Sequence, residues 1–315
     1  MPRHALIVAG PTASGKSALA IALAGRCNGT IINADSMQVY RELRIITARP
    51  SPEDCARVPH RLYGVLSAAE RGNVGWWRAR ALHEIDEAHA SGRLPILTGG
   101  SGLYFAALTE GLSEIPDAGQ NARSEARALL REIGPAALHA RLALVDPATA
   151  ATLRPADSQR VARAWEVWRG TGHGLTAWHA RASGGPALRF TALLLDPPRE
   201  ELRGAIVTRC TSMLQDGAVE EVRELLALGL DAALPAMRAH GVVELGAYLR
   251  GEVSLAMAES QVRSATIQFA KRQATWFRHH TLGDQLYKIN ARFTDLVQFS
   301  ERKLKDIVAF VQTAR

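Results

Sequence analysis

Residues 6–17, Leu-Ile-Val-Ala-Gly-Pro-Thr-Ala-Ser-Gly-Lys-Ser, decide the fold of this chain. They match the phosphate-loop pattern of Gly, four residues and Gly-Lys-Ser. The apolar run at residues 5–9 predicts a buried strand before the loop, and residues 18–25 predict a helix after it. Glycines at positions 10 and 15 let backbone N–H groups turn toward an anion, to which the helix N-terminus adds partial positive charge. The stretch therefore predicts a site for a di- or triphosphate.

The side chains of this loop support the same prediction. Lys16 would reach the phosphates, and the Ser17 hydroxyl would hold Mg²⁺. A Gly-rich turn before a helix is the plain alternative, but it does not explain Lys16 and Ser17. The predicted phosphate-binding residues are Gly10, Pro11, Thr12, Ala13, Ser14, Gly15, Lys16 and Ser17.

Composition narrows the class of protein. The 315 residues are 47% hydrophobic, enough for one large domain or two smaller ones. A net charge of +7 and a pI near 9.7 favour an anionic partner, without separating nucleic acid from a membrane surface or small phosphates. No apolar run is long enough to span a membrane, and the 3 cysteines form neither a zinc pattern nor a disulfide framework. We expect a cytoplasmic enzyme with no signal peptide and no membrane partner.

Further short apolar runs alternate with helical stretches. Strands are predicted at residues 30–34, 94–98 and 190–195, and helices at residues 76–90 and 103–109. This alternation predicts an α/β fold of the phosphate-loop NTPase type, with a parallel sheet flanked by helices. Ligands of such sheets bind at the carboxyl ends of strands. The phosphate loop, Asp35 and residues 99–102 each follow a predicted strand, so we expect them to meet in one crevice.

The character of the chain changes between residues 117 and 185. This segment is rich in Ala and Arg, has a helical period, and is flanked by linkers at residues 116–117 and 183–186. We therefore expect an all-α insertion, residues 117–185, in a phosphate-loop core made of residues 1–116 and 186–315. After the last predicted strand, the chain predicts only helices, at residues 199–228, 255–279 and 296–312.

Two loops beside the predicted crevice carry candidate chemistry. Asp35 could hold Mg²⁺, or it could be a general base that removes a proton from an acceptor. An N-cap or turn aspartate is the alternative. The Gly-Gly-Ser-Gly run at residues 99–102 could offer donors to a phosphate group or simply form a tight turn.

Two basic helical segments could bind a polyanion. Gln159 and Arg163 share one helix face, which Arg160 borders, and a phosphate backbone could lie there. A solvated basic face is the alternative. Residues 270–280 mix basic with aromatic side chains, which suits nucleic acid or, alternatively, an amphipathic helix with its aromatic residues in the core.

Together these stretches resemble the tRNA dimethylallyltransferases. The resemblance covers almost the whole chain, and phosphate-loop kinases lack its Asp-Ser-Met-Gln and Gly-Gly-Ser-Gly-Leu-Tyr blocks. The matching stretches, in the order of the family, are residues 10–17, 33–40, 47–50, 58–60, 98–104, 159–161 and 270–273.

The resemblance implies a defined reaction. A dimethylallyl group would pass from dimethylallyl diphosphate to N6 of the adenosine just 3′ of the anticodon, tRNA position 37. Asp35 would be the base for N6, and Arg209 would join the phosphate loop and Mg²⁺ in binding the diphosphate. The implied contacts with the tRNA anticodon stem-loop are Asp35, Ser36, Met37, Gln38, Ser101, Arg123, Gln159, Arg160, Val161, Ala162 and Arg163. We expect a monomer.

The chain departs from the family pattern at three places. Ser101 stands where Thr is more common, Ile267 replaces a usual Arg, and residues 41–46 lack the usual glycines. We expect no zinc finger of the eukaryotic type, given the cysteine count. Two alternatives stay open: a small-molecule kinase with ATP in the loop and Asp35 on Mg²⁺, and an RNA-binding protein with a nucleotide switch. A kinase would need an adenine-binding lid, for which the sequence shows no clear signature.

Overall fold

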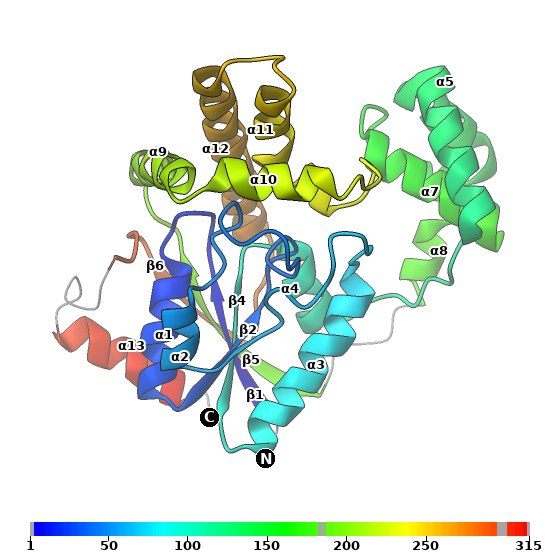
Figure 1. Cartoon of the computed structure of the whole chain (residues 1–315). Helices are drawn as coiled ribbons and strands as arrows, with labels where there is room; N and C mark the ends of the chain where they lie inside the picture. The colour runs from blue at the N-terminus through cyan, green and yellow to red at the C-terminus, as the bar shows by residue number, and fades with distance from the viewer. Residues whose placement is uncertain (1–2, 182–184, 186, 295–300, 314–315) are drawn as a thin grey trace. The chain divides into compact units, whose positions relative to one another are not determined.

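The computed structural model of the protein describes residues 3–181, 185, 187–294 and 301–313. The chain divides into two compact units (Figure 1). One unit joins Met1–Thr109 to Pro186–Arg315, and the other is Glu110–Gly185. The second unit thus begins at Glu110, before the boundary that the sequence predicted at residues 116–117. The predicted linker at residues 183–186 falls largely outside the described residues.

Within the described residues, the larger unit contains a six-stranded parallel sheet in the order β3-β2-β4-β1-β5-β6. Four strands confirm the predicted ones. β3 and β6 were not predicted, because they are edge strands with mostly exposed or half-exposed residues and so lack an apolar run. The strands are β1 (Arg3–Ala9), β2 (Gly29–Asn33), β3 (His60–Arg61), β4 (Leu94–Gly99), β5 (Leu188–Leu195) and β6 (Gln285–Ile289).

Helices cover both faces of this sheet, as predicted (Figure 1). Successive side chains of a strand point to opposite faces. Accordingly, Ile7 of β1 packs with α3 (Val74–Ala90), α4 (Gly102–Thr109), α9 (Arg199–Gln215) and α12 (Leu255–His279). Leu6 and Val8 pack on the other face, with α1 (Lys16–Arg26) and α13 (Glu301–Thr313).

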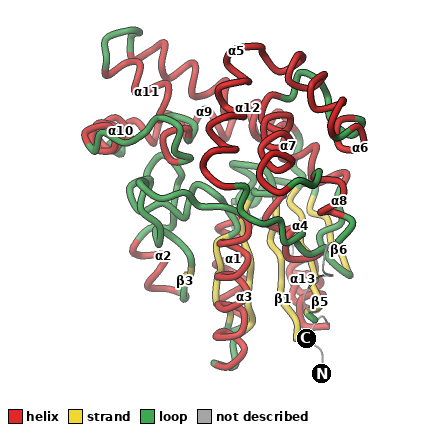
Figure 2. Tube along the Cα trace, turned by 90° about the vertical axis from the view of Figure 1, so that its right-hand side faces the viewer, coloured by secondary structure: helices red, strands yellow, loops and turns green. Residues whose placement is uncertain are grey.

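The region after β5 differs from the prediction in two ways. The helix expected at residues 199–228 is broken at Asp216-Gly217, because Gly217 has a φ of 100°, which a helix cannot accommodate. The chain resumes as α10 (Ala218–Ala227), and α11 (Val242–Leu249) was not predicted. Figure 2 shows α10 and α11 beyond the carboxyl ends of the strands. The helix expected at residues 296–312 begins at Glu301, and residues 296–300 lie outside the described part.

Two short helices complete the described part of the larger unit: α2 (Pro52–Arg57) and a 3₁₀ turn, Ala236–Arg238. The smaller unit has its own core, in which Leu138, Leu142, Val161 and Trp165 are buried. Its described residues form helices and no strand. These helices are α5 (Gly119–Val145), α6 (Pro147–Ala150), α7 (Ser158–Thr171) and α8 (Leu175–His179). No helix among the residues with assigned structure is both long and apolar enough to cross a membrane.

Candidate active site

The phosphate loop connects the carboxyl end of β1 to α1. Its curvature depends on Gly15, whose φ is 88° and where an added Cβ would lie 1.9 Å from the carbonyl oxygen of Phe293. Two contacts from the segment after β6 hold the loop: Phe293 N–H donates to the Ser14 carbonyl (2.9 Å), and Arg292 Nε donates to the Ala13 carbonyl (2.9 Å). Contacts within the protein therefore hold the loop in its curved shape.

Strand register brings the predicted segments together. Ala9 of β1 pairs with Gly99 of β4, and Thr98 of β4 pairs with Asn33 of β2. The three strands consequently end at the same edge of the sheet. The phosphate loop, residues 99–102 and Asp35 follow these ends, which confirms that they share one edge.

A buried asparagine positions Asp35. Asn33 is 0% exposed, and its Oδ1 accepts the Asp35 N–H (2.9 Å) while its Nδ2 donates to the Asp35 carbonyl (2.9 Å). The Asn33 carbonyl in turn accepts Nε1–H of Trp77 (2.8 Å). Asp35 Oδ1 accepts the N–H of Met37 (2.9 Å), and the Asp35 residue is half-buried. The carboxylate is thus held in one orientation while it still faces partly toward solvent.

Aromatic side chains stand close to this carboxylate. Trp77 stacks on Tyr104, with ring centroids 4.1 Å apart and planes 14° from parallel. Burial raises the pKa of both Tyr104 and Tyr63, and the negative charge of Asp35 shifts both in the same direction. Both phenols therefore stay neutral at physiological pH, and they lie near enough to Asp35 for its charge to act on them. Sequence analysis assigned no role to Trp77 or Tyr63, because no local pattern marked them.

Two cations accompany Asp35. Burial lowers the pKa of Lys16 to about 8, with Asp35 raising it and Arg209 lowering it further. Burial also lowers the pKa of Arg209, against the opposing effect of Asp35. The phosphate loop and α9 thus bring two positive charges to one carboxylate. Considered alone in the sequence, Arg209 was unremarkable, and only the resemblance pointed to it.

A buried amide joins the phosphate loop to residues 99–102. Gln273 of α12 is 5% exposed; its Oε1 accepts the N–H of Thr12 (2.8 Å), and its Nε2 donates to the carbonyl of Gly100 (2.9 Å). The next residue, Ser101, accepts the N–H of Ser36 on its Oγ (2.9 Å). Hydrogen bonds therefore run from the phosphate loop to the segment that follows Asp35. Sequence analysis matched residues 270–273 to the family but did not foresee this contact.

The glycines of residues 99–102 serve close packing. A Cβ at Gly99 would lie 2.0 Å from the carbonyl oxygen of Ala34, and one at Gly100 would lie 2.1 Å from Gln273 Nε2. A Cβ at Gly102 would meet the ring of Trp276 at 2.2 Å. The run is therefore a closely packed connection between β4 and α4 that supports the Asp35 segment, and this packing leaves the predicted donation to a phosphate untested.

The glycine-poor segment at residues 41–46 is held by a carboxylate from α10. Glu221 accepts the backbone N–H groups of Arg44 (2.9 Å), Ile45 (2.7 Å) and Ile46 (3.0 Å). Nearby, Gln38 Nε2 donates to the carbonyl groups of residues 47 and 48 (2.9 and 3.2 Å). Hydrogen bonds from backbone N–H groups to Glu221 therefore stabilise this bend without glycine. The carbonyl groups that follow the bend hold the side chain of Gln38. Sequence analysis missed Glu221, which had no recognisable pattern around it.

The candidate residues of the smaller unit begin α7. Asp157 caps this helix by accepting the N–H of Arg160 (3.2 Å). Gln159, Arg160 and Arg163 are exposed, as a polyanion-binding face requires. Val161 is 0% exposed, so its side chain belongs to the core and cannot contact RNA; the local pattern did not reveal this helical phase.

Two candidate arginines of this unit pair with carboxylates. Arg123 of α5 pairs with Asp117 and, at 3.3 Å, with Glu166. Arg163 also pairs with Glu166. Ala162 is half-buried beside these residues. Glu166 therefore groups Arg123 and Arg163 on neighbouring helices of one unit.

A phosphate loop at the end of β1, with a positioned carboxylate after β2 at the same edge of the sheet, defines a phosphate-loop α/β protein. A family model described as IPP transferase matches residues 38–280. The chain belongs to this family. The chain is therefore an enzyme, and Trp77 and Gln273 lie within the matched residues, which Asp35 precedes.

Known relatives agree with this assignment. The chain is 57% identical over 313 residues to a protein named tRNA dimethylallyltransferase from Granulibacter bethesdensis, covering 98% of each chain. It resembles the solved tRNA isopentenylpyrophosphate transferase of Bacillus halodurans with a TM-score of 0.70 and 31% identity, covering 100% of this chain and 97% of that one. A eukaryotic dimethylallyltransferase acting on tRNA shares the fold, with a TM-score of 0.81, 24% identity, and 98% and 78% coverage.

Proposed function

We propose that this protein transfers the dimethylallyl group of dimethylallyl diphosphate to N6 of the adenosine at tRNA position 37. The observation that carries the proposal is the convergence of Asp35 with the phosphate loop at one sheet edge, where Gln273 joins the loop to Gly100. The names of the curated relatives support the same donor group and the same class of acceptor.

Asp35 would activate the acceptor. The N6 amine of adenine is a weak nucleophile, because its lone pair is drawn into the ring. As N6 forms a bond to the allylic carbon, the bond from that carbon to the diphosphate oxygen breaks, and the N6 proton passes to the Asp35 carboxylate. Asn33 holds the backbone of Asp35, and the N–H of Met37 donates to its carboxylate.

The phosphate loop would stabilise the leaving group. Negative charge grows on the diphosphate, where the loop N–H groups, Lys16 and Arg209 place positive charge. With a pKa of about 8, Lys16 is largely protonated at neutral pH, and a bound diphosphate would favour its charged form further.

We also propose Mg²⁺ as the cofactor. No cluster of three or more His, Cys, Asp or Glu among the described residues could hold a metal ion by itself. The exposed Ser17 hydroxyl at the start of α1 nevertheless fits Mg²⁺, which takes few protein ligands and completes its shell with phosphate oxygens and water. Such an ion would neutralise charge on the diphosphate.

The tRNA would be held at two places. Ser36, Met37, Gln38 and Ser101 surround the Asp35 turn and are the proposed contacts of the extruded adenine, whose unstacking costs a few kcal/mol. In the smaller unit, Arg123 and the exposed face formed by Gln159, Arg160 and Arg163 would bind the anticodon stem-loop through its phosphates.

These arginines can exchange partners. The side chains of Arg123 and Arg163 are 36% and 44% exposed, so phosphate can compete with the carboxylates that pair with them. We also propose that the protein acts as a monomer in the cytoplasm.

The decisive experiment supplies radiolabelled dimethylallyl diphosphate, tRNA and Mg²⁺ without ATP. We expect label in the tRNA and one diphosphate released per modified adenosine. An absolute requirement for ATP, with release of ADP, would instead favour the kinase alternative.

The Asp35→Asn variant tests the base. Turnover should fall roughly 10²-fold or more while donor and tRNA binding stay near normal. Turnover within threefold of the unmodified protein would remove the general-base role, and a loss of Mg²⁺ affinity would assign Asp35 to the metal.

A further inference from the structure

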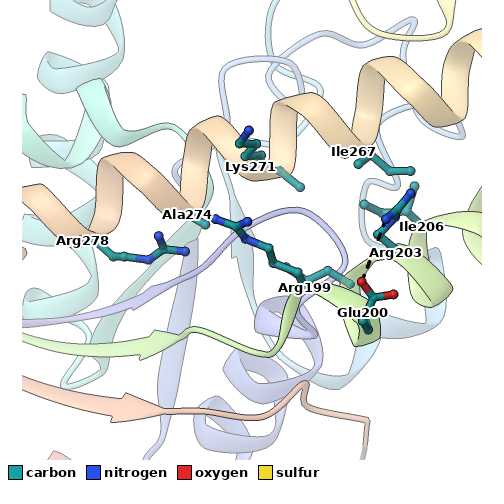
Figure 3. A pocket seen from close by; sticks show the side chains of 10 residues that line it. Arg199, Glu200, Arg203, Ile206, Ile267, Lys271, Ala274 and Arg278 are labelled. Carbon is teal, nitrogen blue, oxygen red and sulfur yellow. Dashed lines mark ion pairs between the residues drawn. The ribbon is translucent and has the colours of Figure 1, made fainter.

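A pocket of about 270 Å³ lies between α9 and α12 (Figure 3). Its floor is apolar and includes Ile206 and Ile267. Ile267 is the position at which the resemblance predicts Arg, so this chain has an apolar side chain where the family more often has a cation. The rim is cationic and carries Arg199, Arg203, Lys271 and Arg278.

The rim has an excess of positive charge. Figure 3 shows the side chains of Arg199 and Arg278 extending toward each other beside Ala274. Arg203 and Arg278 have distant carboxylate partners, Glu200 at 4.0 Å and Asp196 at 3.9 Å.

The other two rim cations lack such partners. Among the described residues, no carboxylate lies within ion-pair distance of Arg199 or Lys271. Both side chains belong to exposed residues. The pocket therefore joins apolar surface to cations that are available to an anion.

Two links connect this pocket to the phosphate loop. On α12, Gln273 lies between the pocket residues Lys271 and Ala274 and accepts the N–H of Thr12 of the loop. On α9, Ile206 lies one turn before Arg209, whose charge interacts with that of Lys16. The helices that line the pocket thus also carry Gln273, which contacts the phosphate loop, and Arg209, whose charge acts on Lys16 of that loop.

We propose that this pocket captures the diphosphate-bearing donor before it enters the phosphate loop. The ligand would be a short prenyl diphosphate, with its apolar end over Ile206 and Ile267 and its diphosphate at the arginine rim. Arginine donors match phosphate oxygens, and a cationic cleft raises the association rate of an anion by 10- to 10³-fold. This inference rests on the proposed function, because it takes its ligand from that reaction.

The first test removes rim charge. Arg199→Gln combined with Lys271→Gln should slow the association of dimethylallyl diphosphate about five- to tenfold at low ionic strength, measured by stopped-flow tryptophan fluorescence. The difference should vanish at about 0.5 M salt, where screening is strong. Arg80→Gln, which removes an exposed charge from α3, should leave association unchanged. Equal association rates in the double variant and the unmodified protein would overturn the proposal.

The second test separates the prenyl group from the diphosphate. Ile267→Gln should slow the association of dimethylallyl diphosphate about two- to threefold but leave that of inorganic diphosphate unchanged, since only the former has an apolar end. Equal effects on both probes would contradict the proposal that the prenyl group lies over Ile206 and Ile267.

A third measurement separates the donor from RNA. The dissociation constant for tRNA, measured without donor, should stay within twofold in the double variant. Weaker tRNA binding with unchanged donor association would overturn the proposal and assign the pocket to the RNA backbone. If the unmodified protein neither binds nor transfers the donor, the proposed function and the capture site both fail. Normal transfer with unchanged donor association rejects the capture site alone.

Discussion

Truncation of Gln273 should weaken the fold and the reaction together. Gln273→Ala removes the acceptor of the Thr12 N–H (2.8 Å) and the donor to the Gly100 carbonyl (2.9 Å). Gly100 is buried, so its carbonyl cannot turn to water, whereas Thr12 is half-buried and regains water in part. A buried group left unpaired costs about 1–3 kcal/mol and an ordinary hydrogen bond contributes about 0.5–1.5 kcal/mol, so the free energy of unfolding should fall by about 2–4 kcal/mol.

Urea unfolding followed by tryptophan fluorescence measures this change. The matched control is Gln268→Ala, the same substitution at an exposed position of the same helix. Its free energy of unfolding should lie within about 0.5 kcal/mol of the unmodified protein. If Gln273→Ala loses no more stability than Gln268→Ala, the argument from the buried amide is refuted.

Turnover provides an independent readout of the same substitution. Gln273 fixes the spacing between the phosphate loop and residues 99–102, and Ser101 carries this spacing to Ser36. Misalignment of the reacting groups by about 1 Å can cost 10²-fold in rate, so turnover at saturating substrates should fall about 10- to 100-fold. Lower stability with normal turnover would mean that Gln273 supports the fold without aligning the site.

Three other substitutions or conditions have expected outcomes. Burial lowers the Lys16 pKa from 10.5 to about 8, so the affinity for the donor should fall as the pH rises above 8. Calorimetry in buffers of different ionisation enthalpy should show that the protein takes up protons when the donor binds. The same shift should raise the free energy of unfolding between pH 8 and 10.5, where the unfolded chain binds more protons; a flat profile in both assays would contradict it. Glu221→Gln weakens the hydrogen bonds to the N–H groups of residues 44–46, so it should lower the free energy of unfolding by about 1–2 kcal/mol and raise the KM for tRNA. An unchanged KM would mean that Glu221 does not help to position Gln38 for tRNA. Arg160→Ala with Arg163→Ala should reduce the slope of log affinity for tRNA against log salt by about 0.7–0.9 per lost contact, and an unchanged slope would mean a merely solvated face.

Local pattern was enough for the core of the fold. The strands β1, β2, β4 and β5 are buried apolar runs bounded by turn residues, and this signal needs no knowledge of the partners of each strand. The phosphate loop and Asp35 were found for the same reason, since each directly follows such a strand. Edge strands β3 and β6 lack that burial and therefore lacked the signal.

The sequence by itself thus determined an α/β chain with a phosphate loop, a carboxylate at the end of another strand and a helical insertion, whereas the sheet order placed β4 between those two strands. Only the tertiary structure decided which distant side chains hold these parts in place. Gln273 bonds a residue 261 positions away, and Glu221 bonds residues 175 to 177 positions away. The helical phase that buries Val161 depends likewise on the neighbouring helices. Such contacts depend on how helices pack in space, which short-range periodicity does not encode.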